Sequence, residues 1–144
     1  MPKTQNRYFW VGLLLYVVSF FLAAVADPII GSSPLRGYQC AYLALLSWDA
    51  LYRTPDLRPR FEMVSLVISG SINVVFLLAA IVAFAPRWRL VFFLLRTIVV
   101  LMLPFCWVVF YYEQLYPREG YVLWTAGMLS TMFSQSLVGS FVPP

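Results

Sequence analysis

The chain has 144 residues, of which 62% are hydrophobic and 11% are charged, and its mean hydropathy is +0.81. About a quarter of the residues of a soluble domain are charged, so this composition excludes an ordinary soluble domain and indicates a polytopic membrane protein. Ten Lys and Arg against six Asp and Glu give a formal net charge of +4, but they are scattered between apolar runs, which argues against a nucleic-acid partner. Since a span needs ~20 residues, four spans nearly fill one domain over residues 1–144.

The first apolar run covers residues 8–26 and follows Lys3 and Arg7. This order resembles a signal peptide, but Asp27 and Pro28 do not form a small-residue cleavage site. The residue before a proline is also biased away from the helical region. The run therefore predicts a retained spanning helix that ends before Asp27.

A loop over residues 29–37 is predicted by its Gly, Ser and Pro content. The next apolar run, residues 38–52, contains Asp49 and is shorter than the ~17–25 residues that a spanning helix needs. We therefore expect a short interfacial or re-entrant helix here. A fifth span is the alternative.

Three further spans are predicted over residues 63–85, 90–112 and 120–139. Only four residues, 86–89, separate the second span from the third, so these two helices should be antiparallel neighbours. The predicted fold is all-α: a four-transmembrane-helix bundle with a short interfacial or re-entrant helix between the first two spans.

The orientation of these spans depends on Lys and Arg in the short loops, whose numbers on the two sides are nearly equal. The first helix usually dominates, and the link between the second and third spans carries Arg87 and Arg89 without an acidic residue. We therefore expect a multi-pass protein of the inner (cytoplasmic) membrane with both termini in the cytoplasm.

Arg96 is a charged residue inside the predicted span 90–112. Such a charge costs ~2.5–3.5 kcal/mol on insertion scales, and no Asp or Glu is predicted at its depth. Its guanidinium either extends to the inner headgroups or forms a lipid or polar site with Ser134 and Gln135, which lie at a matching depth of the last span. Asn73 of the second span is a further candidate for this site.

Small and polar residues recur at intervals of four on two of the predicted spans, and therefore lie along one face of each helix. Such residues let helix backbones approach closely, so we predict that they pack helices together, with a polar pathway as the alternative. They are Ser65, Ser69 and Asn73 on the second span and Ala126, Ser130 and Ser134 on the last.

Catalytic and metal-binding patterns are missing from the sequence. The chain has no His and two cysteines, Cys40 and Cys106, which do not suffice for a zinc site or for haem ligation through His. It also lacks a phosphate-binding glycine motif, a nucleophile elbow and a carboxylate pair. We therefore expect no enzymatic activity and no cofactor.

Three short motifs carry a resemblance: Gly-Tyr-Gln-Cys-Ala at residues 37–41, Asn73 within the second span, and Gly-Tyr-Val-Leu-Trp at residues 120–124. Together with the layout of the helices, they resemble uncharacterised small bacterial four-helix integral membrane proteins. The resemblance implies the same topology and no particular activity.

The sequence predicts a small integral membrane protein that acts through helix packing, as an accessory or scaffolding subunit of a membrane complex or as a homo-oligomer. Its expected partners are membrane lipids and other membrane subunits or further copies of itself. The alternative is a lipid- or small-molecule-binding transport protein with a polar site around Arg96, Asn73 and Gln135.

Overall fold

The computed structural model describes residues 3–26, 33–53, 61–112 and 115–134. Helices dominate this part of the chain, and three short strands join them at one end. In chain order the elements are α1 (Lys3–Ser19), β1 (Ala23–Ala26), β2 (Leu35–Arg36), α2 (Gly37–Arg53), α3 (Phe61–Val82), the 3-10 helix η1 (Pro86–Trp88), α4 (Arg89–Tyr112), β3 (Tyr116–Pro117) and α5 (Glu119–Ser134).

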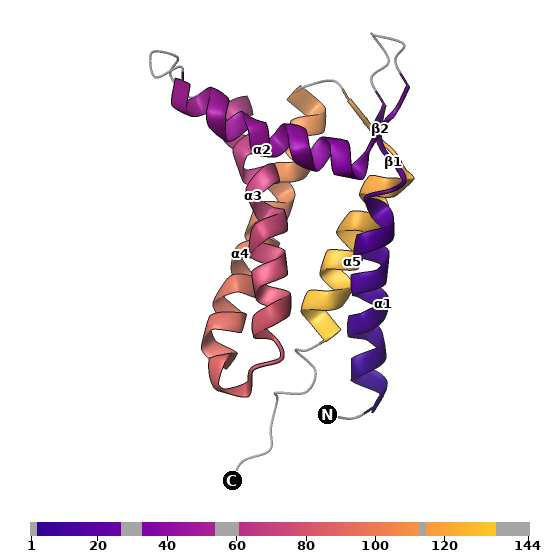
Figure 1. Ribbon diagram of the computed structural model, residues 1–144, viewed down its shortest axis with the longest axis vertical. Coiled ribbons are helices and arrows are strands. Elements are labelled where there is room, and N and C mark those ends of the chain that lie inside the picture. Colours follow the sequence, from indigo (N-terminus) through magenta and orange to yellow (C-terminus); the bar gives the residue numbers. More distant parts are fainter. Residues whose placement is uncertain (1–2, 27–32, 54–60, 113–114, 135–144) are drawn as a thin grey trace.

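The long helices form two pairs, α1 with α5 and α3 with α4 (Figure 1). Helix α2 runs across the end of the molecule at which the sheet lies, and η1 connects α3 to α4 at the opposite end. The prediction that the helices on either side of residues 86–89 are antiparallel neighbours is confirmed.

Helices α1 and α5 approach each other at the distance of backbone contact, because each has a glycine at the crossing. A Cβ atom on Gly127 would lie 2.6 Å from the backbone nitrogen of Tyr16, and one on Gly12 would lie 2.5 Å from Oγ1 of Thr131. The Thr131 hydroxyl donates a hydrogen bond to the carbonyl oxygen of Gly127 at 2.8 Å and so adds no unpaired group to the contact. Small residues thus set the spacing of this pair.

Large side chains fill the seam between the two pairs. The rings of Tyr16 and Phe76 pack with their centroids 4.4 Å apart, and Met128 and Met132 of α5 are fully buried. Flexible Met side chains adapt to the gaps between rigid rings. The same core contains Ile72, Ala79, Val99, Leu103, Cys106, Tyr121 and Trp124.

The sheet ties the end of α1 to the beginnings of α2 and α5. Strand β1 lies in the middle and pairs antiparallel with β2 and β3, in the register Ala23 to Arg36 and Val25 to Pro117. The amide of Gly37 donates to the carbonyl oxygen of Leu22 at 3.1 Å. The first turn of α2 is therefore held against the end of α1.

The predicted bundle of four transmembrane helices is wrong, because most of the helices are too short or not apolar enough to cross a membrane. In the part of the chain that the structure describes, one helix is long and apolar enough to cross a membrane, over Arg89–Phe110. The apolar stretches of α1 and α3 are shorter, Arg7–Ser19 and Val67–Val82, and α5 has 16 described residues. Multi-pass topology loses its support for the same reason.

The error at the first predicted span has a physical cause. The run 8–26 is apolar throughout, but the helix ends at Ser19, whose Oγ donates to the carbonyl oxygen of Tyr16 at 2.5 Å, and the chain continues into β1. An apolar strand and an apolar helix cannot be told apart by hydropathy alone. The sheet also corrects the all-α prediction.

The other predicted helices are present with shifted ends. The short helix predicted over 38–52 is α2, and the runs 63–85 and 90–112 correspond to α3 and α4. The run 120–139 begins as α5, and its last residues, 135–139, lie outside the described residues.

Candidate functional site

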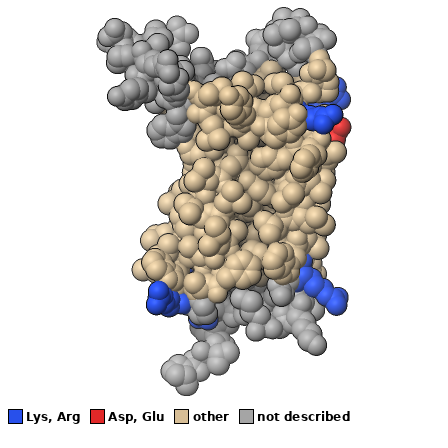
Figure 2. All heavy atoms as spheres, in the orientation of Figure 1, with Lys and Arg blue, Asp and Glu red and all other residues tan. Residues whose placement is uncertain are grey.

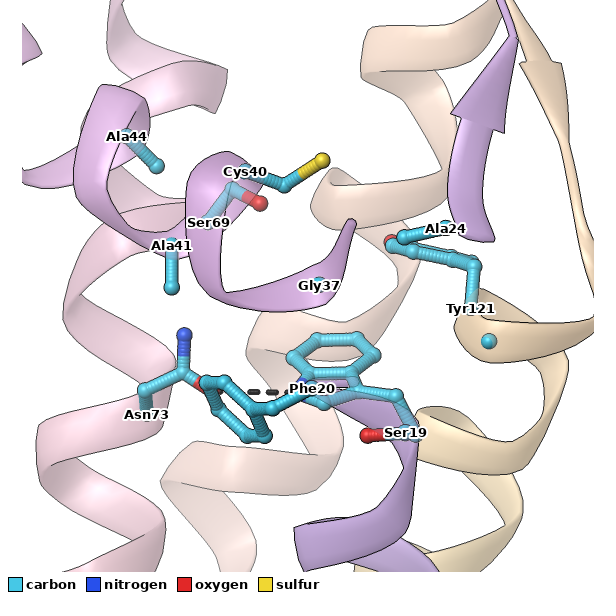
Figure 3. Close-up of a pocket in the computed structure, with 12 residues that line it drawn as sticks. Ser19, Phe20, Ala24, Gly37, Cys40, Ala41, Ala44, Ser69, Asn73 and Tyr121 are labelled. Atoms are coloured by element: carbon cyan, nitrogen blue, oxygen red, sulfur yellow. Dashed lines mark hydrogen bonds between the residues drawn. The ribbon is translucent and has the colours of Figure 1, made fainter. Parts of the chain in front are cut away.

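A pocket of about 50 Å³ lies beneath α2, between the two helix pairs (Figure 3). Its floor is Asn73 of α3, and its walls come from α1, α2 and α5. Small side chains of α2 face it, with the methyl group of Ala41 pointing toward Asn73. It is partly open to the surface, so a group larger than water has a way in.

Asn73 joins three helices through one atom. Its Oδ1 accepts a hydrogen bond from the hydroxyl of Tyr16 in α1 at 3.1 Å and another from Nε1 of Trp124 in α5 at 2.9 Å. The indole nitrogen can only donate, so the atom that it contacts must be the amide oxygen. This fixes the orientation of the side chain and places the amide nitrogen, with its two donors, toward Ala41 and the pocket.

Tyr121 of α5 contributes a second polar group to the pocket. Its ring packs edge-on against Phe110, with centroids 4.4 Å apart, and against Trp107 at 5.1 Å. The side chain is 9% exposed, and its buried hydroxyl has no hydrogen-bond partner among the described residues. Figure 3 shows this hydroxyl pointing toward the interior of the pocket. A buried hydroxyl without a partner is costly, so this one is available for a bound group.

All polar side chains that line the pocket are neutral: Ser19, Ser69, Asn73, Tyr121 and Cys40. Burial raises the pKa of the Cys40 thiol to about 11, so the thiol stays protonated at neutral pH and is a weak nucleophile. A charged ligand would lose its hydration here without an opposite charge to replace it. The pocket therefore suits a neutral ligand that accepts hydrogen bonds.

Metal binding finds no support in the described residues, where His, Cys, Asp and Glu do not gather in groups of three or more. Both cysteines are free thiols, Cys106 being buried with its Sγ 3.4 Å from the carbonyl oxygen of Met102. The arrangement can hold a hydrogen-bonding group in place but offers no pair of groups for proton transfer.

Arg96 lies apart from this pocket. Its guanidinium carbon is 4.5 Å from the centroid of the Phe133 ring, so it contacts α5 across the seam with α4. The neighbouring Ser134 is buried, and its hydroxyl donates to the carbonyl oxygen of Thr131 at 2.8 Å. Gln135 lies outside the described residues. Asn73 lines the pocket and Arg96 does not, so the two candidates belong to different places.

The predicted packing residues fall into three groups. Ser65 is fully buried in α3, with no hydrogen-bond partner for its hydroxyl among the described residues, whereas Ser69 lines the pocket. On the face predicted for the last helix, Ser130 is exposed, Ala126 is half-buried and Ser134 is buried. Helix α5 turns the adjacent face, with Gly127, toward α1.

The sequence reasoning missed Tyr16, Tyr121 and Trp124. Each is a polar aromatic residue within an apolar helix, and such residues usually find a hydrogen-bond partner when they are buried. That rule identifies the residue type from the sequence. The hydrogen-bond partner can be identified only when it is known which helices are neighbours.

Comparisons with protein families, with curated proteins and with solved structures found no match to this chain. The resemblance to small bacterial four-helix membrane proteins therefore stays a prediction, and the geometry above carries the functional argument.

Proposed function

We propose that this protein is held in a membrane by α4 and acts there through contacts with other membrane helices. The observation that carries the proposal is the exposure of α4. The most apolar 18-residue stretch within its segment Arg89–Phe110 has a mean hydropathy of 2.3, yet only 17% of that stretch is buried. A core helix of a soluble protein of that length is mostly buried. An apolar helix exposed to this extent needs lipid or a partner.

The distribution of charge supports a lipid environment. On the face that Figure 2 shows, basic and acidic residues lie near the two ends and none lies across the broad band between them; Arg96, within the apolar segment of α4, is half-buried. Arg7, Arg87 and Arg89 lie toward the η1 end, and Arg36 and Arg118 lie at the sheet end. The short η1 link carries Arg87 and Arg89 without an acidic residue, so the positive-inside rule favours the η1 end as the cytoplasmic side.

Contact with another helix is supported by the pattern of exposed residues on α4. Leu90, Leu94, Ile98 and Leu101 are all exposed, at intervals of four, four and three residues. This spacing is that of the seam of a coiled coil, and these residues run along a broader exposed apolar face that also includes Phe93 and Phe105. We infer that this face packs against a helix of a second copy or of a larger membrane complex, for which this protein is an accessory subunit.

Membrane anchoring is tested by washing membranes from expressing cells with alkaline carbonate. The protein should remain in the membrane pellet with integral marker proteins. Release into the supernatant with peripheral markers would contradict anchoring by α4.

The contact function is tested by placing a photo-crosslinking amino acid at Ile98, with Val11 on the exposed face of α1 as the matched control position. Illumination in native membranes should give a protein adduct from position 98, identified by mass spectrometry as this chain or one defined membrane protein, and a weaker adduct from position 11. Adducts to lipid alone at position 98 would overturn the contact function while leaving membrane anchoring intact.

A further inference from the structure

The pocket beneath α2 has hydrogen-bonding capacity that the protein itself does not use. Both lone pairs of Asn73 Oδ1 are occupied by Tyr16 and Trp124, but its amide nitrogen faces the pocket with two donors. The Tyr121 hydroxyl is buried without a partner among the described residues and points into the pocket from the α5 side. Unused donors in an otherwise apolar wall indicate a site for an oxygen atom that accepts hydrogen bonds.

We propose that this pocket binds the neutral oxygen-bearing head, an ester carbonyl or a hydroxyl, of a ligand that is otherwise apolar. The Asn73 amide and the Tyr121 hydroxyl lie on different sides of the pocket, so each would bind a different oxygen atom of the head. A carbonyl oxygen would accept from one of the two groups, and a ligand hydroxyl would accept from Asn73 or donate to Tyr121. Phosphate and carboxylate are disfavoured, because none of the lining residues is charged.

Size restricts how much of the ligand enters. A volume of about 50 Å³ is about a third of that of a ~150 Å³ cavity that holds one benzene molecule, so the pocket takes only a small head group. The rest of the ligand must leave through the open side. The geometry points to capture of a head group and not to a passage through the protein. The predicted transport site around Arg96, Asn73 and Gln135 stays a prediction, since Gln135 lies outside the described residues.

The shared chemistry, an ester carbonyl with a neighbouring hydroxyl, occurs both in membrane diglycerides and in small water-soluble esters of glycerol. Four probes separate these sources: dioctanoylglycerol, dioctanoyl phosphatidic acid with the same chains and a charged phosphate, glycerol monoacetate without chains, and hexadecane without oxygen. The full chain is reconstituted in phosphatidylcholine nanodiscs, and each probe is titrated into it.

Cys40 reports occupancy, because it lines the pocket. Its modification by N-ethylmaleimide is followed by peptide mass spectrometry, which distinguishes it from Cys106. Dioctanoylglycerol should slow the modification several-fold, and hexadecane and phosphatidic acid should not. Protection by glycerol monoacetate as well identifies a small soluble ester as sufficient, whereas protection by dioctanoylglycerol alone identifies a lipid. No protection by either neutral ester, or equal protection by phosphatidic acid, overturns the proposal.

Two variants test the assigned groups without removing Asn73, which also links the helices. Tyr121→Phe deletes only the unpartnered hydroxyl and should raise the half-maximal concentration of the protecting ester about five- to tenfold, the value of one hydrogen bond. Ala41→Leu fills the space above Asn73 and should abolish protection. Tyr42→Phe, at an exposed position of α2, is the matched control and should leave the titration unchanged.

The fold of each variant is checked by its far-ultraviolet CD spectrum and its thermal unfolding. A folded Tyr121→Phe variant with unchanged ester titration would remove Tyr121 from the site and overturn the proposed geometry. This outcome is independent of the crosslinking at Ile98, so the pocket and the contact function can fail separately.

Discussion

Two tyrosines in the same core have opposite hydrogen-bonding status, and this predicts opposite effects of the same substitution. Tyr16 donates to Asn73 Oδ1 at 3.1 Å, whereas the buried Tyr121 hydroxyl has no partner among the described residues. Replacing either residue by Phe removes one oxygen atom and keeps the ring, whose packing is therefore preserved.

The expected magnitudes follow from the two environments. Tyr16→Phe loses one hydrogen bond of about 0.5–1.5 kcal/mol, and Asn73 keeps its second donor, Trp124, so its oxygen is not left unpaired. We expect the free energy of unfolding to fall by about 1 kcal/mol. Tyr121→Phe relieves the desolvation of an unpaired hydroxyl, about 1–3 kcal/mol, so the free energy of unfolding should stay the same or rise.

The measurement is equilibrium unfolding of both variants by SDS titration from a mild non-ionic detergent, followed by far-ultraviolet CD and done without added lipid. The difference between the two variants should be at least about 1 kcal/mol, with Tyr121→Phe the more stable. If Tyr121→Phe loses as much stability as Tyr16→Phe, the Tyr121 hydroxyl has a partner, and the reasoning about an unused group in the pocket is refuted.

Three further predictions concern other parts of the molecule. Gly127→Ala should lower the free energy of unfolding by about 2 kcal/mol or more in the same SDS titration. The clash of the new methyl group with the backbone of α1 outweighs the ~1 kcal/mol by which Ala favours a helix over Gly. The control Ser130→Ala, at an exposed position, should change the free energy of unfolding by less than about 0.5 kcal/mol. At about pH 8, the Cys40 thiol should be alkylated about a hundredfold more slowly in the folded protein than in the unfolded chain, because only the thiolate reacts. The rate should rise about tenfold per pH unit toward the pKa of about 11. An alkylation rate in the folded protein within about tenfold of that in the unfolded chain would contradict the raised pKa. Arg96→Leu should lower stability by only about 0.5–1 kcal/mol, the value of its contact with the Phe133 ring, and native mass spectrometry should show less bound anionic lipid if Arg96 also holds a headgroup; unchanged lipid occupancy would leave Arg96 as an anchor at the membrane surface.

Sequence reasoning recovered the helices better than their ends and their neighbours. The runs 38–52 and 90–112 coincide with α2 and α4 to within a residue or two, because length, apolarity and flanking turn residues are local properties. Ala23–Ala26 was assigned to a helix, since an apolar strand that pairs with residues distant in the chain has no local signature in hydropathy.

The candidate site was recovered only in part, for the same reason. Asn73 and Ser69 stood out as polar residues on one face of an apolar helix. Their surroundings depend on tertiary neighbours: Tyr16 lies 57 positions from Asn73, and Trp124 lies 51 positions away. No spacing rule within one helix connects residues so far apart.

The pairing of α1 with α5 has a consequence for biosynthesis. Helix α1 is made first, but its closest neighbour follows only after α2, α3 and α4, while α3 and α4 can meet as soon as α4 is made. The contact surface of α1 at Gly12 therefore stays without its partner until α5 has been made. At high expression α1 can instead pair with α5 of another copy. The expected by-product is a domain-swapped dimer, which does not dissociate on dilution.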